Sequence, residues 1–258
     1  MQPIDLSIFP PEREQALCSI ERYNKFGIMF YRSNLWQHAQ RVLWITEALI
    51  PIAGKYLEFD PEKARALALV HDDPEMVTGD TAAHVKTAMT PEETAAHDQN
   101  EIKAIESLAS SYPDTVHGYS YKELLLHSLR KDCPEAWLVS YADKLDAYGE
   151  SLHDLLAGNF VLLWPVMFYV LTLDQFPKKL PGLASLLASS DSVLTDPKSR
   201  RTPDPITLDS YLGFGTPHTI ESVRKNTDFP LYDAWKQIVL EGGSAEGLDW
   251  LTMQKEGL

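Results

Sequence analysis

The chain has 258 residues, of which 44% are apolar, so it can bury a sizeable core and is not a disordered protein. Its net charge of −14 and its sequence pI of 4.9 exclude the basic surface that a nucleic-acid polymer requires. The only cysteines, Cys18 and Cys133, are too few for a disulfide framework, which favours a cytoplasmic protein.

Helical periodicity dominates the first third of the chain. Apolar residues recur every three or four positions and predict helices over residues 12–24, 34–50 and 61–72. His38 lies beside the apolar stripe of the second helix, and Asp60 is the expected N-cap of the third. The end of the third helix is almost wholly apolar, so we expect it to be buried where it reaches His71.

Helices are also predicted through the rest of the chain. Pro74 should break the third helix, with Asp73 as a candidate cap for a short turn that follows. Thr90 and Glu93 form a capping box that opens the helix to residue 110. Further helices are expected over residues 81–89, 121–130, 134–157 and 230–241, with loops at 113–118 and 189–208.

The most apolar run covers residues 160–173. It is shorter than the roughly 20 residues of a membrane span, and it contains Pro165. We therefore expect a buried helix pair or hairpin there, and no membrane partner.

The end of the third helix also carries the strongest chemical signal. His71 and Asp72 are adjacent, Glu75 follows one turn later, and a Thr-Gly-Asp turn ends at Asp80. Imidazole and carboxylate groups are good ligands for a divalent metal. The spacing places Glu75 where it could hold a metal-bound water, so the segment predicts a hydrolytic metal centre.

These segments resemble the HD-domain metal-dependent phosphohydrolases, in which the ligands follow the order His, His-Asp, Asp. The local pattern is similar to the bacterial 5′-deoxyribonucleotidase branch, through His71 to Asp80, Val85-Lys86 and Ala142-Asp143. The likeness covers about residues 20 to 160. The chain departs from this branch at residues 82–84, where a Pro-Thr-Pro segment is replaced. It also departs at residues 22–26, where an Arg-Trp pair that contacts phosphate and sugar is expected.

The resemblance implies an all-α fold, an HD-domain helical bundle with a C-terminal helical and loop extension. We expect the HD-type domain over residues 1–165 and the extension, packed on the same domain, over residues 166–258. The first domain would contain every residue of the site.

The resemblance also implies one divalent metal ion, of a kind that the sequence does not specify, held by His38, His71, Asp72 and Asp143. Each ligand has a structural alternative. His38 could be a hydrogen-bonded core histidine, and Asp72 could cap the break before Pro74. Asp143 competes with Asp146, which lies one turn further along the same predicted helix.

The remaining site residues follow from the same likeness. Glu75 is the expected general base, with an ordinary first-turn glutamate as the alternative, and Asp80 is either a helix cap or an active-site acid. Three cations are candidate contacts for the substrate phosphate, although each could be an ordinary surface residue: Lys86, Arg32 and Lys25.

The implied enzyme removes the 5′-phosphate of (deoxy)nucleoside monophosphates by attack of a metal-bound water. The alternatives are an HD-type nucleoside triphosphate triphosphohydrolase, a cyclic-nucleotide or alarmone phosphodiesterase, and a non-catalytic HD-fold sensor. Its partners would be a small nucleotide and, by family analogy, a second copy in a homodimer.

Overall fold

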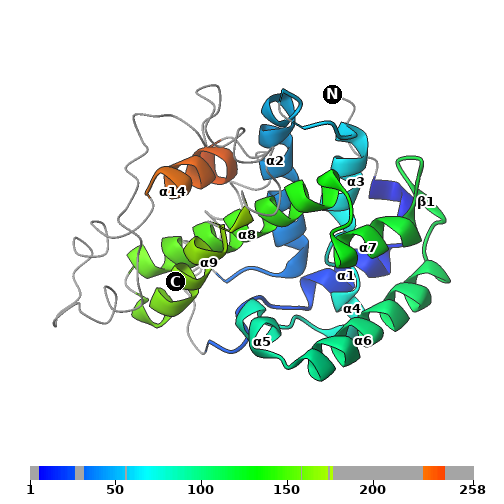
Figure 1. Ribbon diagram of the computed structural model, residues 1–258, viewed down its shortest axis with the longest axis horizontal. Helices are drawn as coiled ribbons and strands as arrows, with labels where there is room; N and C mark the ends of the chain where they lie inside the picture. The colour runs from blue at the N-terminus through cyan, green and yellow to red at the C-terminus, as the bar shows by residue number, and fades with distance from the viewer. Residues whose placement is uncertain are drawn as a thin grey trace. The chain divides into compact units, whose positions relative to one another are not determined.

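The computed structural model describes residues 6–26, 32–55, 57–157, 159–173, 175–176 and 229–241, which are almost entirely helical (Figure 1). The all-α prediction is confirmed. The expected loop at 189–208 and most of the expected extension lie outside the described residues. In chain order the described elements are η1 (Leu6–Ile8), α1 (Pro11–Cys18), α2 (Leu35–Ala53), α3 (Pro61–Val70), α4 (Glu75–Thr78), α5 (Ala83–Ala88), α6 (Pro91–Ala109), β1 (Thr115–Val116), β2 (Tyr119–Ser120), α7 (Tyr121–Arg130), α8 (Pro134–Leu156), η2 (Phe160–Leu162), α9 (Leu163–Leu173), α14 (Phe229–Lys236) and the π-helical turn η4 (Gln237–Glu241).

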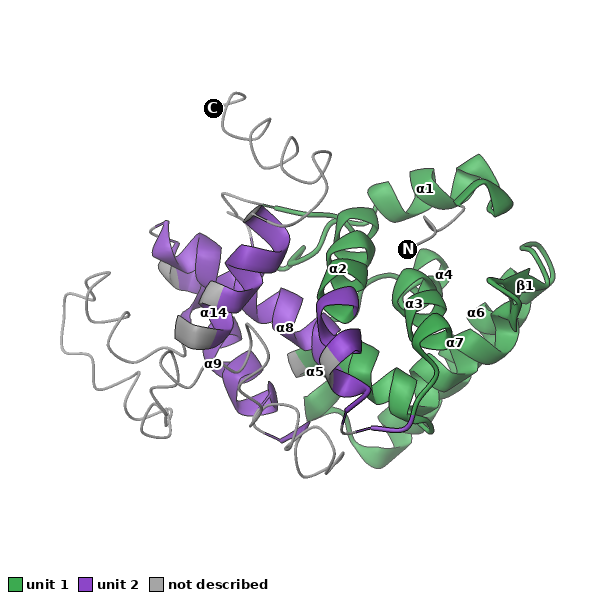
Figure 2. Cartoon of the chain, turned by 90° about the horizontal axis from the view of Figure 1, so that it is seen from above, with its two compact units in different colours: residues 1–25, 32–46, 59–140 green, residues 26–31, 47–58, 141–258 purple. Residues whose placement is uncertain are grey.

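The chain divides into two compact units (Figure 2). Unit 1 comprises residues 1–25, 32–46 and 59–140, and unit 2 comprises residues 26–31, 47–58 and 141–258. The division falls inside α2 and inside α8. The domain boundary expected at residue 165 stays a prediction.

The core of unit 1 is built around α3. Its residues from Ala66 to Val70 are all buried, as the apolar end of this helix predicted. Asp60 caps its start, because the carboxylate accepts hydrogen bonds from the backbone N–H groups of Glu62 and Lys63 at 3.0 and 3.3 Å. The Thr90–Glu93 capping box at the start of α6 is also confirmed.

Two backbone features of unit 1 differ from the predictions. Helix α1 ends at Cys18 rather than at residue 24, because the chain beyond it pairs with a distant segment: the N–H of Arg22 donates to Ser33 O, and Glu21 forms an antiparallel bridge with Asn34. Residues 115–120 form a two-stranded hairpin rather than a loop. Strands of two residues are too short to show alternation in the sequence.

Unit 2 packs a C-terminal helix against α8. Trp235 of α14 donates from its indole N–H to the buried carboxylate of Asp146 at 2.9 Å. The indole lies directly against Gly149, where an added β-carbon would be 2.1 Å from the ring. The described part of the extension is therefore attached to α8 through a specific contact.

The apolar run at residues 160–173 forms η2 and α9, and it is buried on one face only. Val166 and Val170 are buried, whereas Trp164 and Leu171 are exposed. Among the described helices, none is both long enough and apolar enough to cross a membrane.

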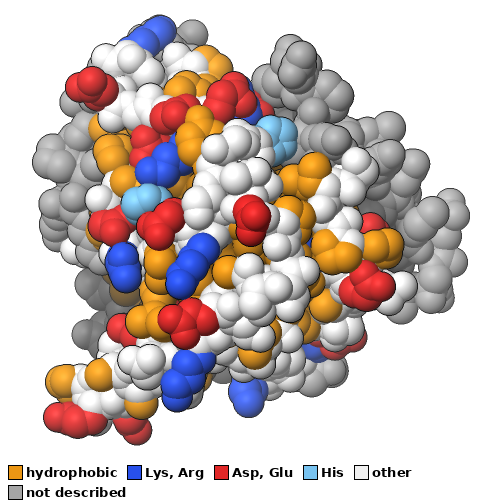
Figure 3. Space-filling view, turned by 90° about the vertical axis from the view of Figure 1, so that its right-hand side faces the viewer, with side chains coloured by type: hydrophobic (Ala, Val, Ile, Leu, Met, Phe, Trp, Pro, Cys, Tyr) orange, Lys and Arg blue, Asp and Glu red, His pale blue; other side chains and the backbone are white. Residues whose placement is uncertain are grey.

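Charged side chains of both signs share the surface. On the face drawn in Figure 3, acidic groups lie among the lysines and arginines, and histidines are visible between them.

Candidate metal centre and active site

The turn between α3 and α4 carries the centre of the site. Helix α3 ends at Val70, and the N–H of Asp73 bonds to the carbonyl of Val70 while the N–H of Glu75 bonds to that of Asp72. On this turn, the side chains of Asp72 and Asp73 contact different groups, the histidines and Arg13 respectively. The sequence predicts that Asp73 caps the turn after Pro74, and this prediction is wrong. The carboxylate of Asp73 is buried and accepts hydrogen bonds from Arg13 and Tyr121 instead.

His71 has the protonation pattern of a metal ligand. Its Nδ1 lies 2.8 Å from the carbonyl oxygen of Ala68, and since a carbonyl only accepts, Nδ1 carries the hydrogen. In the neutral ring the lone pair is then on Nε2, which is buried and has no hydrogen-bond partner. A buried acceptor without a donor is costly unless a cation binds it, so this residue fits a divalent metal.

His38 and Asp72 converge on the same point. Asp72 Oδ2 lies 3.3 Å from Nε2 of His38 and 3.3 Å from Nε2 of His71. The two imidazole rings are 5.3 Å apart, centroid to centroid. Asp72 therefore faces the histidines rather than capping the helix break, and His38 faces polar groups rather than an apolar core.

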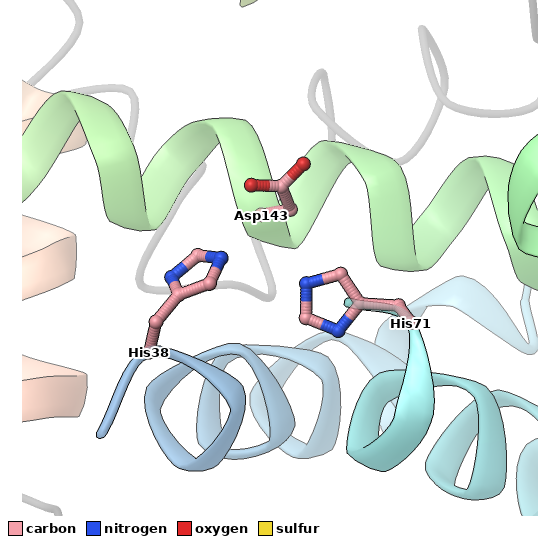
Figure 4. Close-up of side chains that lie close together, drawn as sticks. All are labelled: His38, His71 and Asp143. Atoms are coloured by element: carbon pink, nitrogen blue, oxygen red, sulfur yellow. The ribbon is translucent and has the colours of Figure 1, made fainter. Parts of the chain in front are cut away.

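Asp143 is the fourth predicted ligand, and it lies on α8. One candidate ligand atom each of His38, His71 and Asp143 lies within 4.8 Å of the others, and Figure 4 shows the two imidazole rings beside Asp143. Its carboxylate also accepts a bond from Lys144. The competing residue, Asp146, is instead occupied by Trp235 in unit 2.

Glu75, at the start of α4, is a buried carboxyl group beside these ligands. Burial raises its pKa well above the usual range, and the nearby carboxylates of Asp72 and Asp80 raise it further. Lys86 opposes this effect from 3.6 Å. A carboxyl with a raised pKa holds a proton more readily, which suits a general base.

Asp80 lies in the same group of charges but does not cap a helix. Helix α5 begins at Ala83, and its N-cap, Ala82, makes no side-chain capping bond. The cap interpretation is therefore wrong. Burial raises the pKa of Asp80, while the guanidinium of Arg22 acts in the opposite direction.

Lys86 on α5 is held between two carboxylates. Its Nζ lies 3.2 Å from Glu101 of α6 and 3.6 Å from Glu75. Burial alone would lower its pKa, but these carboxylates raise it well above the usual value. Lys86 is therefore a firmly charged cation next to the candidate base.

The other two predicted phosphate contacts also belong to unit 1. Arg32 donates to the carboxylate of Glu21 at 3.3 Å and to the carbonyl of Tyr23 at 3.5 Å. Lys25 is exposed. Their roles stay predictions.

Sequence reasoning missed several groups that the structure brings to the site. Arg22 is buried, and its charge acts on both Glu75 and Asp80. Glu101 holds Lys86, and Arg13 holds the turn through Asp73. The sequence offered one signal, an arginine just before the aromatic residue at position 23, where the resemblance expects an Arg-Trp pair.

Two further clusters of candidate ligands occur in unit 1. One joins His97, Asp98 and Glu101 on α6, and the other joins His127, Asp132 and Cys133 between α7 and α8. In the second, Nδ1 of His127 already bonds to Asp132 Oδ1 at 2.5 Å. Neither cluster contains a buried nitrogen like Nε2 of His71.

Comparisons with known proteins identify a family and several relatives of this chain. A family described as 5′-deoxynucleotidase YfbR-like matches residues 15–162. Two 5′-deoxynucleotidases are similar to this chain: one of Vibrio parahaemolyticus, 31% identical over 128 residues, and one of Cronobacter sakazakii, 31% identical over 133 residues. These alignments cover 49% of this chain, and only 64% and 63% of the respective relatives.

A solved structure supports the fold. The crystal structure of an HD-domain phosphohydrolase from Listeria innocua matches with a TM-score of 0.54 and 21% identity, over 69% of this chain and 88% of that one. At this identity the likeness concerns the fold alone.

Proposed function

Because the chain belongs to the YfbR-like 5′-deoxynucleotidase family, we propose that it is a metal-dependent phosphohydrolase acting on nucleoside monophosphates. Its reaction would release inorganic phosphate and a nucleoside, with deoxynucleotides as the preferred substrates. The two curated relatives are described as 5′-deoxynucleotidases, which supports this substrate class.

One observation carries the proposal. Nε2 of His71 is buried without a hydrogen-bond partner, and Asp72 Oδ2 lies 3.3 Å from it and 3.3 Å from Nε2 of His38. The histidines, Asp72 and Asp143 would hold one divalent ion. When bound, such an ion lowers the pKa of a water molecule and polarises a phosphoryl oxygen.

The side chains around this centre supply the proton transfers. Glu75 would accept the proton of the attacking water, because it is buried beside Asp72 and its pKa is raised. Asp80 would orient or protonate the leaving 5′-oxygen. Lys86 and Arg22 would offset the negative charge of the phosphate oxygens during the transfer.

Tyr23 is the candidate residue for discriminating deoxyribose from ribose. It lies next to Arg22, whose guanidinium carbon is 5.8 Å from the ring centroid, and its φ of 54° is left-handed. A non-glycine residue in that conformation costs about 1–3 kcal/mol and often marks a functional site. The sequence offers three aromatic candidates for this role, Tyr23, Phe26 and Trp36, and the ring of Trp36 lies 5.7 Å from the guanidinium carbon of Arg13. We infer that Tyr23 limits the space for a 2′-hydroxyl group.

The quaternary and cellular context are part of the proposal. We propose a homodimer located in the cytoplasm, with one divalent ion in each chain. Light scattering and metal analysis of the purified protein would test the first and the last of these statements.

The test of the activity is a substrate panel under one metal. Phosphate release and product mass are measured for dAMP, AMP, dATP and a cyclic dinucleotide. We expect release of phosphate from dAMP, and weaker release from AMP. Release of triphosphate from dATP, with both monophosphates untouched, would reject the proposal and favour a triphosphohydrolase.

A further inference from the structure

A buried ion pair lies behind the turn that carries the metal ligands, and the proposed reaction does not use it. Arg13 of α1 donates from Nε to Asp73 Oδ2 at 2.9 Å and from Nη2 to Asp73 Oδ1 at 2.7 Å. Both side chains are only 1% exposed. The hydroxyl of Tyr121 donates a third bond to the same carboxylate, at 2.8 Å. Asp73 is therefore held by three donors from two other helices.

The same guanidinium also holds the end of α3. Nη2 of Arg13 donates to the carbonyl of Leu69 at 2.8 Å. The last carbonyls of a helix lack partners within it, and a cation is favourable at that end of the helix dipole. Arg13 thus binds the chain on both sides of the His71-Asp72 pair, at Leu69 before it and at Asp73 after it.

Arg13 reaches the other histidine-bearing helix as well. Its guanidinium carbon lies 4.2 Å from the ring centroid of Phe9 and 5.7 Å from that of Trp36. Trp36 is on α2, two residues before His38. Arg13 therefore contacts both the segment that carries His71 and the helix that carries His38.

Net stability is a poor explanation for this arrangement. Taking two charges out of water is costly, and well-packed apolar residues often replace a buried ion pair without loss of stability. What the ion pair adds is direction, because a bidentate carboxylate contact fixes both partners in one geometry. At this place the fixed geometry is that of the backbone from which His71 and Asp72 project.

We propose that Arg13 is a positioning residue of the metal centre, acting through Leu69 and Asp73 on the turn that carries His71, Asp72 and Glu75. This inference rests on the proposed function, since it assumes that the turn holds a metal. Loss of a group that orients a metal ligand typically costs about 10- to 100-fold in metal affinity or activity. We expect a loss of this size for Arg13→Lys, which keeps the charge but not the fork of donors.

The experiment compares metal affinity with stability in matched variants of the full chain. Co²⁺ is titrated into each protein, and both its dissociation constant and its visible absorbance, which reports ligand geometry, are measured beside the thermal midpoint without metal. The variants are Arg13→Lys, Arg13→Met, Tyr121→Phe and the double variant Arg13→Met with Asp73→Asn. Tyr119→Phe is the control, because it also removes one hydroxyl donor from an aspartate of unit 1, Asp60, but acts at the opposite end of α3.

The double variant separates positioning from stability. It removes both charges, so the apo-protein should regain most of the thermal stability that Arg13→Met alone would lose, yet its Co²⁺ affinity should stay about 10-fold or more below wild type. At saturating metal, kcat should fall while KM changes little. Tyr119→Phe should lower the thermal midpoint slightly and leave the Co²⁺ affinity and spectrum unchanged.

Two results would contradict the inference in different ways. Wild-type Co²⁺ affinity and spectrum in the folded double variant and in Arg13→Lys would reduce Arg13 to a structural role and leave the proposed function standing. A wild-type protein that binds no Co²⁺ and hydrolyses no nucleotide would overturn the proposed function and this inference with it.

Discussion

Two segments of unit 1 carry a histidine followed by an aspartate, and they differ in what surrounds the pair. At the end of α3, His71 is buried, its Nδ1 is fixed by the Ala68 carbonyl, and Asp72 lies 3.3 Å from its other nitrogen. On α6, Nδ1 of His97 lies 4.0 Å from Asp98, whose side chain is 53% exposed.

The difference comes from the backbone. Neighbouring residues within a helix point in different directions, so Asp98 is turned toward solvent and His97 lies nearer to Glu101, at 3.8 Å. Where a buried helix ends in a turn, as at Val70, neighbouring side chains can converge. Of these two adjacent pairs, the one at a buried helix end is therefore the one whose side chains converge.

Replacing the two histidines should give the largest contrast. His71→Ala should lose bound metal and turnover, by more than the roughly 10- to 100-fold cost of removing a group behind a ligand. His97→Ala should retain both. Because a ligand that binds only the folded state stabilises it, added Co²⁺ should raise the thermal midpoint of wild type and His97→Ala but not that of His71→Ala. Equal metal content in the two variants would remove the distinction between the segments.

The next test uses the two carboxylates that hold Lys86. Glu75 follows the His71-Asp72 pair, and Glu101 follows the His97-Asp98 pair on α6. Glu75→Gln should keep the metal and lower kcat by about 10²-fold or more, the usual contribution of a general base. Glu101→Gln should keep kcat within a few-fold and act on KM, since it only frees Lys86 from one partner. Steady-state kinetics at saturating metal measures both. A near-normal kcat for Glu75→Gln would move the base role to Asp80.

The smallest effect on stability is expected at the N-terminal end of α3, which is opposite to the end that carries His71. The hydroxyl of Tyr119 bonds to Asp60 at 2.6 Å, and this bond holds the pKa of the Asp60 carboxyl below its ordinary value of 3.8. A lowered pKa stabilises the fold above pH 3.8, and the contribution is lost as the pH falls through the folded value.

Tyr119→Phe should therefore raise the Asp60 pKa, as followed by NMR of the carboxyl carbon. Its small thermal destabilisation should be present at neutral pH and shrink in acid, with metal binding unchanged. An Asp60 pKa that does not move in this variant would show that the helix cap, rather than the tyrosine, sets it.

Local signals in the sequence determined much of this protein. The cap at Asp60, the capping box at Thr90 and the apolar end of α3 each depend on residues within a few positions, and the structure has all three. Burial of His71 and its position beside Asp72 follow from the same signals. The family pattern then singled out His38 and Asp143 as candidate ligands, and they lie near His71.

Only the tertiary structure decided what the remaining charged residues do. Arg13 and Asp73 are separated by 60 positions, so no periodicity or cap signal connects them, and Asp73 looked like a local cap beside Pro74. In the sequence, Glu101 is one of several charges on a polar helix. Its contact with Lys86 arises only because α6 packs near α5 in the fold. Asp146 is bonded to Trp235 of α14, a partner that lies 89 positions away in the sequence. These long side chains pair with residues that only the packing of the helices brings near. Their pairing therefore depends on the tertiary structure and not on the neighbouring sequence.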